Sequence, residues 1–183
     1  EQKFEEMVFM FPEVRSALQK HFFTYNDINR QWQREMLKNI QFMLYLPWDI
    51  LDEMTISLSV DIFDENQEIF KQGQVSDKVY ILSRGKIEIF LTIPEGELFL
   101  DLITEPGSVL SQISILNRMK LTYSARAKED TEMLSISYEK LQEQRALNHM
   151  QPLNQEIEKY FEKTWNYSLV KFLAGMREFL LKI

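Results

Sequence analysis

Apolar and polar residues follow two different periods along this chain, and the change of period predicts its organisation. Apolar residues recur every three or four positions from Phe4 to about Asp52, which is typical of helices. After Thr55 the period falls to two, and short runs rich in β-branched and aromatic residues are separated by turn residues. From Ser137 onward the helical period returns. The pattern predicts an α+β chain in which helices flank an antiparallel β-roll or jelly roll on both sides.

Three helices are predicted before the roll. The first, Phe4–Lys20, has its first break at Pro12, and a second over Ile28–Met43 can be capped by Asn26 and Asp27. The inward stripe of the second helix would be Trp32, Met36, Ile40 and Met43, while Arg30, Arg34 and Lys38 face water. A third, shorter helix begins around Leu46-Pro47-Trp48, with Ile50, Leu51 and Met54 on its inner side.

The roll itself is predicted to contain seven strands, joined mostly by short connections. They are Leu58–Phe63, Glu68–Lys71, Lys78–Ser83, Lys86–Thr92, Glu97–Thr104, Leu121–Ala127 and Glu132–Ser137. Alternation should place Ile87, Ile89 and Leu91 on one face, and Leu98, Leu100 and Leu102 on one face. Arg84-Gly85 has the form of a tight hairpin, and Asn66 stands where a left-handed residue is useful.

The tail is predicted to form two further helices, Tyr138–Ala146 and a longer one from Pro152 to Ile183. The longer helix either docks on its own domain or serves as a moving or partner-binding helix, because a long amphipathic stripe at a terminus can fill a groove on another chain. We expect three parts: a helical linker-like region at 1–39, the β-roll domain at 40–148 and a C-terminal helix at 149–183.

Composition and charge remove several classes of function. The net charge is −7 and no long basic run occurs, which disfavours nucleic-acid binding. The chain has no cysteine, and its two histidines, His21 and His149, lie far apart in sequence. Five glycines cannot form a Walker loop or a GxGxxG turn anywhere. We therefore expect no metal site and no enzymatic activity.

Nothing in the chain is long enough to span a membrane, since an apolar stretch such as Phe42–Trp48 falls far short of about 18 residues. The chain begins at Glu1 with no signal-like segment, so we expect it to be a fragment of a longer protein.

The longest irregular connection, Glu105–Lys120, is the expected site of function. It contains Pro106-Gly107-Ser108 and then a short helix candidate, Gln112–Leu116. The start of such a helix offers free backbone N–H groups, the usual means of holding a phosphate.

Taken together, these features resemble the cyclic-nucleotide-binding domain, which senses cAMP or cGMP in kinase regulatory subunits, CRP-type regulators and nucleotide-gated channels. The resemblance covers about Ile40–Asn148 and is carried by LPWDILDEM, EIFKQGQVSDKVYILSRGKIEIF and LTYSARAKEDTEMLSISYEKL, the last looking most like the channel members. Gly73, Gly85 and Gly107 stand at the family's diagnostic glycine positions.

The phosphate cassette departs from the family pattern. The resemblance implies a Phe-Gly-Glu triplet, whose Glu contacts the ribose hydroxyl, and an Arg that pairs with the cyclic phosphate; here the matching residues are Leu110-Ser111-Gln112 and Leu121. Loss of the Arg–phosphate contact costs about 2–3 kcal/mol, or two decades of affinity. Lys120 or Arg118 could supply a charge in a shifted register, and Thr122 matches a position where some members contact a guanine base. The degenerate cassette is thus expected to comprise Gly107, Leu110, Ser111, Gln112, Ile113, Ser114, Lys120, Leu121 and Thr122.

The resemblance implies a regulatory sensor domain of a membrane cation channel or ion exchanger, with weak or lost cAMP or cGMP binding and no other cofactor. Its mechanism would be a population shift between two positions of the C-terminal helices relative to the roll. The shift would be controlled either by an intrinsic contact, such as Leu110 and Leu121 packing in the nucleotide's place, or by a partner chain. Its partners would be the rest of a longer membrane protein or other subunits of an oligomer, reached through the flanking helices, at the cytosolic face of a membrane. The alternative is a soluble or ciliary interaction protein that uses a degenerate domain of this kind.

Overall fold

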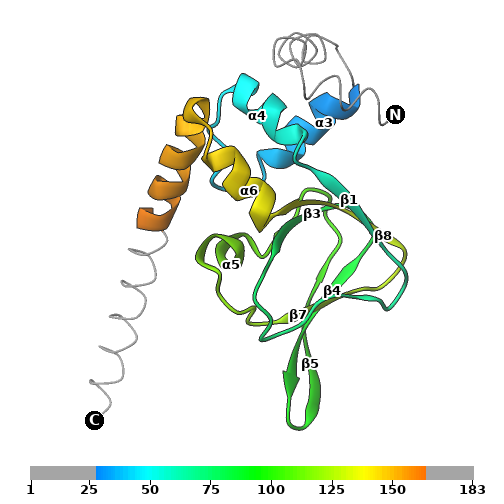
Figure 1. Cartoon of the computed structure of the whole chain (residues 1–183). Helices are drawn as coiled ribbons and strands as arrows, with labels where there is room; N and C mark the ends of the chain where they lie inside the picture. Colours follow the sequence, from blue (N-terminus) through cyan, green and yellow to red (C-terminus); the bar gives the residue numbers. More distant parts are fainter. Residues whose placement is uncertain (1–27, 164–183) are drawn as a thin grey trace, which may run out of the picture.

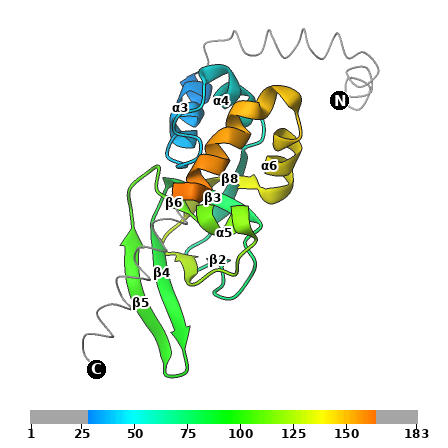
Figure 2. The same cartoon turned by 90° about the vertical axis from the view of Figure 1, so that its left-hand side faces the viewer.

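The computed structural model describes residues 28–163, which form a two-sheet β-roll with a layer of helices at one end. In Figure 1 the helices α3 (Ile28–Leu37), α4 (Trp48–Thr55) and α6 (Tyr138–Arg145) lie above the strands, and α5 (Gln112–Asn117) lies beside them. In Figure 2 the hairpin of β4 (Ile87–Ile93) and β5 (Gly96–Ile103) extends away from the helices. The predicted helix Phe4–Lys20 and the tail beyond residue 163 lie outside the described residues.

The helices are short and the strands account for most of the roll. The helices are α3 (Ile28–Leu37), α4 (Trp48–Thr55), α5 (Gln112–Asn117) and α6 (Tyr138–Arg145), followed by the 3₁₀ turn Asn148–Met150 and helical residues 151–163. The strands are β1 (Ser59–Phe63), β2 (Glu68–Phe70), β3 (Lys78–Arg84), β4 (Ile87–Ile93), β5 (Gly96–Ile103), β6 (Val109–Leu110), β7 (Ser124–Ala127) and β8 (Thr131–Ser137).

The strands form two antiparallel sheets, in the orders β1-β8-β3-β6 and β2-β7-β4-β5. The predicted fold class and all seven predicted strands are confirmed, with strand ends shifted by at most three residues. The two-residue strand β6 was not predicted, because two residues are too few to show alternation.

The two sheets enclose one core, and the helices cover a second. Alternate residues of β3 supply both cores: Val79 and Ile81 face the helical layer, whereas Tyr80 and Leu82 face the inside of the roll. The core under the helices combines Leu37, strand residues and Leu153. Segments on both sides of the roll therefore pack in one core, and the predicted boundaries at 39/40 and 148/149 stay a prediction.

The second predicted helix ends earlier than expected, at Leu37 instead of Met43. The chain continues in tight turns, in which Ile40 N–H donates to Leu37 O at 3.0 Å and Met43 N–H donates to Ile40 O at 2.8 Å. These turns bury Ile40, Phe42 and Met43 together, which one helix face could not do.

Two side chains of α3 also lie differently from the prediction. Trp32, expected inside, is 36% exposed. Arg34, expected in water, is half-buried and forms an ion pair with Asp52 of α4 at 2.9 Å, so it joins the two helices. The third predicted helix is confirmed as α4, with Pro47 immediately before it and Ile50, Leu51 and Met54 buried.

Arg84-Gly85 is not a hairpin. β3 lies in one sheet and β4 in the other, so these residues cross between sheets. The conformational part of the prediction is confirmed, since Gly85 has φ +112° and Asn66 has φ +65°.

A β-bulge overturns the predicted face of β5. Leu98 pairs with Leu91, whereas Leu102 pairs with Glu88, and an extra residue at Leu100 lies between the two registers. Because Glu88 and Leu91 are three positions apart on β4, Leu98 and Leu102 point to opposite faces. Both leucines are roughly half-exposed, since this hairpin extends beyond the roll (Figure 2).

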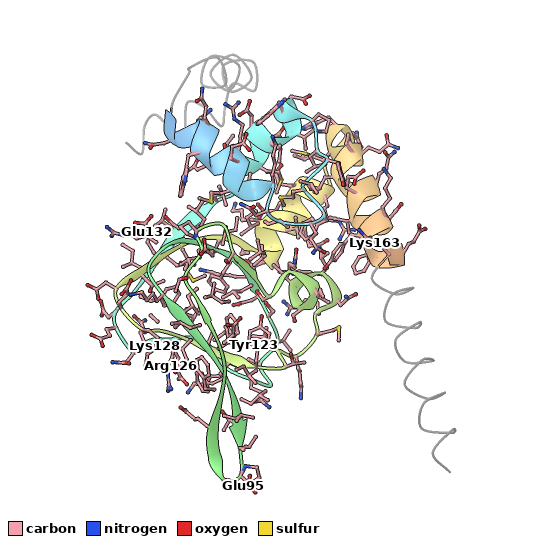
Figure 3. The ribbon with its side chains drawn as sticks, turned by 180° about the vertical axis from the view of Figure 1, so that it is seen from behind. Glu95, Tyr123, Arg126, Lys128, Glu132 and Lys163 are labelled. Atoms are coloured by element: carbon pink, nitrogen blue, oxygen red, sulfur yellow. The ribbon has the colours of Figure 1, made fainter. Side chains whose placement is uncertain are left out.

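Arg126 of β7 covers the outer face of the second sheet (Figure 3). It pairs with Glu88 and, at 2.8 Å, with Glu97, and its guanidinium lies 4.4 Å from the Phe90 ring centroid. Ile87 and Ile89 share one face, as predicted, and are buried in the same cluster, while Phe90 on the opposite face is buried as well because Arg126 covers it.

Helix α6 begins at a side-chain cap. The Ser137 hydroxyl accepts a hydrogen bond from Lys140 N–H at 3.1 Å. We expect Ser137→Ala to lower the free energy of unfolding by about 1 kcal/mol, because one amide of the first turn loses its partner. Urea denaturation measures the change, and an unchanged midpoint would show that the cap contributes nothing.

Within residues 28–163, no helix combines the length and the apolar character needed to cross a bilayer.

Candidate functional site

The connection between β5 and β7 folds as a turn, strand β6 and helix α5, and it packs against both β3 and the helical layer. Gly107 N–H donates to Leu82 O at 2.7 Å, and Leu82 N–H donates to Ser108 O at 2.9 Å. Gly107 has φ +89°, and a Cβ there would lie 2.8 Å from Asn39 Nδ2. The positive φ therefore favours a glycine here, whereas the contact with Asn39 involves the end of an exposed side chain that can move aside.

Ser111 keeps the left-handed backbone of the cassette without a glycine. Its φ is +61°, it is buried, and its hydroxyl donates to Lys78 O at 2.5 Å. A non-glycine residue is strained in the left-handed backbone conformation, and the hydrogen bond to β3 offsets part of this strain. The start of α5 is therefore fixed to the sheet.

Gln112 does not present its carbonyl oxygen to the roll interior. Gln112 Oε1 accepts a hydrogen bond from Gln41 N–H at 3.1 Å, in the turns that follow α3. The residue expected to touch a ribose hydroxyl therefore contacts the helical layer instead.

The hydrogen bond between Gln112 and Gln41 predicts the effect of placing a Glu, the residue that the resemblance implies, at position 112. We expect Gln112→Glu to leave affinity for cAMP and cGMP within about twofold of the natural chain, because the new carboxylate would still accept from Gln41 N–H, and a charged acceptor strengthens such a bond. Titration calorimetry of both proteins checks this, and a tenfold gain in affinity would show that the side chain reaches the ligand.

Leu121 and Leu110 lie together in the core between the sheets. They are 4% and 3% exposed, in a cluster with Tyr80 and Leu82. The backbone of Leu121 is held as well, since its N–H donates to Gln74 O and its carbonyl accepts from Gly73 N–H, each at 2.7 Å. The position matched to the phosphate-binding Arg is thus part of the apolar core.

The other predicted site residues lie on the outside of the connection. Arg118 lies against Tyr138, with its guanidinium carbon 4.6 Å from the ring centroid, and donates to Ser76 O at 3.4 Å. Lys120 is exposed and forms an isolated bridge with Val75. Ile113 and Thr122 are also exposed, and Ser114 is half-buried. The structure therefore does not bring Arg118 or Lys120 to the core beside Leu121.

Tyr123 is a partly buried residue that the sequence pattern did not single out, although it lies two positions after Leu121 on an alternating segment. It lies among the strands of the roll (Figure 3), with its ring centroid 5.6 Å from that of Phe70. Burial raises the pKa of its hydroxyl, and a hydrogen bond from the Ser111 backbone acts in the opposite direction by stabilising the phenolate.

A hollow of about 620 Å³ lies elsewhere on the roll, lined by Glu68, Lys71, Gln72, Gly73, Thr92, Glu97 and Ser124. Its one cationic side chain, Lys71, already pairs with Glu68 at 2.7 Å. Because two carboxylates line it, it suits an anionic ligand poorly. Among residues 28–163, acidic and histidine side chains form no group suited to a metal ion.

The two-sheet roll with a short helix in its long connection has the same fold as several solved structures. The N-terminal domain of a Streptomyces coelicolor A3(2) transcriptional regulator superimposes with a TM-score of 0.60 at 20% identity, over 70% of this chain and 94% of that one. A cyclic nucleotide-binding-like protein of Brucella abortus gives 0.57 at 21% identity, over 61% and 95%.

Residues 61–148 match the sequence model of the cyclic nucleotide-binding domain, so this part of the chain belongs to that family. The cyclic AMP receptor protein of Thermus thermophilus is 29% identical over 88 residues, which are 46% of this chain and 41% of that protein. The chain therefore matches less than half the length of this relative.

Proposed function

We propose that this chain is the regulatory sensor domain of a membrane cation channel or ion exchanger, that its cAMP and cGMP binding is weak or lost, and that it couples movement of the cassette and helices to gating. The observation that carries the loss of binding is the burial of Leu121 in the core, where an Arg would pair with the cyclic phosphate. An alkyl side chain offers a phosphate neither charge nor a hydrogen bond.

The contacts between cassette and helices supply a route for coupling. The turns after α3 touch the cassette through Gln41 N–H and Gln112 Oε1, and they touch the C-terminal helical residues through Phe42, whose ring centroid lies 5.9 Å from that of Tyr160. A displacement of α5 would therefore be transmitted to residues 151–163 through the turns that follow α3. Such a displacement shifts an equilibrium only as far as the controlling ligand or partner prefers one state.

The proposed membrane context is supported by the resemblance of the roll's last strands to channel members and by the helices that flank the roll on both sides. These helices would contact the rest of a longer membrane protein, or other subunits, at the cytosolic face of a membrane. The alternative, a soluble or ciliary interaction protein, is favoured by the same loss of phosphate contact, because a partner could then control the domain without a nucleotide.

Membrane association of the complete natural protein distinguishes the two. We expect it to stay in the membrane pellet after carbonate extraction, and its sequence to contain apolar spans of about 20 residues. Release into the supernatant together with an absence of such spans would contradict the channel or exchanger proposal and favour the soluble alternative.

A further inference from the structure

Four aromatic rings form a continuous row in the roll, in which the two middle rings are buried and the two end rings are partly buried. Phe63 and Tyr80 have centroids 6.3 Å apart, Tyr80 and Phe70 are 6.1 Å apart, and Phe70 and Tyr123 are 5.6 Å apart. These distances lie within the range of favourable ring pairs. Tyr123 ends the row on the side of the cassette.

The Tyr123 side chain packs beside two cassette positions. Its backbone lies two residues after Leu121, and its ring packs against the cluster that contains both Leu121 and Leu110, which lies just before α5. The ring therefore lies beside both the segment that leads into α5 and the strand position matched to the phosphate-binding Arg. A cyclic nucleotide that touched both places would need this same space.

We propose that Tyr123 is the residue that excludes cyclic nucleotides from this domain, by filling the nucleotide's place with its ring. This inference rests on the proposed function and deepens it, since it adds a steric block to the missing charge at Leu121. The two causes act differently. Leu121 lacks the positive charge that would attract the phosphate, whereas the Tyr123 ring must move out of the core before any ligand enters.

The size of the block follows from the population of an open state. If the Tyr123 ring leaves the core about 1% of the time, the apparent affinity falls about 100-fold below that of an open pocket. Removing the ring should therefore raise the apparent affinity by the same factor of about 100, without adding any contact to the ligand.

The test compares single substitutions in the full chain, with cAMP and cGMP as probes and ligand-observed NMR as the measurement, because it reaches millimolar dissociation constants. We expect Tyr123→Ala to bind about 100-fold more tightly than the natural chain. Tyr123→Phe keeps the ring and should stay blocked. Phe63→Ala, which removes a ring from the far end of the same row, is the matched control and should also show no gain.

A gain below threefold for a folded Tyr123→Ala protein, or an equal gain for Phe63→Ala, would overturn the proposal. If Tyr123→Ala does not fold, Tyr123→Leu keeps apolar packing but removes the aromatic ring, and the same comparison then applies to it. Failure of the proposed function has a different signature: the natural chain itself would bind in the low micromolar range.

Discussion

Phe42→Ala is expected to lower the free energy of unfolding by about 3–5 kcal/mol, because it leaves a cavity in a closely packed core. Phe42 is 1% exposed and packs edge-to-face against Tyr160. The substitution therefore loosens the turns after α3 and the C-terminal helical residues together. Urea denaturation followed by circular dichroism measures the effect.

The same substitution at Phe99 is the matched control, because this ring is 57% exposed on β5. We expect Phe99→Ala to change the free energy of unfolding by no more than about 0.5 kcal/mol. Equal losses at the two positions would mean that the core beneath the helices is not packed as described.

Gly85→Ala should be almost as severe, with a loss of about 3 kcal/mol from backbone strain and a steric clash together. At φ +112° an L-residue is strained, and an added Cβ would lie 2.7 Å from the Cα of Thr131 and closer still to its hydroxyl. Thr131 is buried and its hydroxyl donates to Glu129 O at 2.7 Å, so it cannot move aside easily.

Gly73→Ala separates the two causes. Gly73 has φ +83° but no atom within 4 Å of an added Cβ. We expect it to lose only the strain, about 1 kcal/mol, in the same denaturation assay. A loss at Gly73 as large as that at Gly85 would show that the clash with Thr131 contributes little.

The sheet architecture could be predicted from the sequence because local signals agree with one another there. Strand runs such as Lys78–Ser83 have β-branched and aromatic residues bounded by turn residues, and glycine or Asn66 occupies the positive-φ positions other than Ser111 and Arg118. The diagnostic glycines Gly73, Gly85 and Gly107 all have positive φ, as a left-handed or tighter turn requires.

The errors arose where tertiary contacts override a local pattern. The helix from Ile28 ends at Leu37 because tight turns bury more apolar residues than a helix face can. The bulge at Leu100 has no signature in a run of alternating leucines. Sheet membership of β3 and β4 depends on pairing with distant strands, which the dipeptide Arg84-Gly85 does not encode.

The candidate site was predictable in place but not in detail. The long connection and its departures at Ser111, Gln112 and Leu121 were visible in the sequence. That Gln112 contacts Gln41 across 71 positions, and that Tyr123 packs against Phe70, depends on the folded chain. Side-chain direction is therefore the part that the sequence pattern does not contain.

The central claim is that the chain's own residues occupy the place of a cyclic nucleotide. Isothermal titration of the full chain with cAMP and with cGMP tests it most directly, at protein concentrations that resolve dissociation constants from about 1 μM to 1 mM. The account predicts no saturable heat at nucleotide concentrations below about 100 μM. Leu121 supplies no positive charge for the phosphate, and Tyr123 fills the space. A dissociation constant in the low micromolar range for either nucleotide would contradict it.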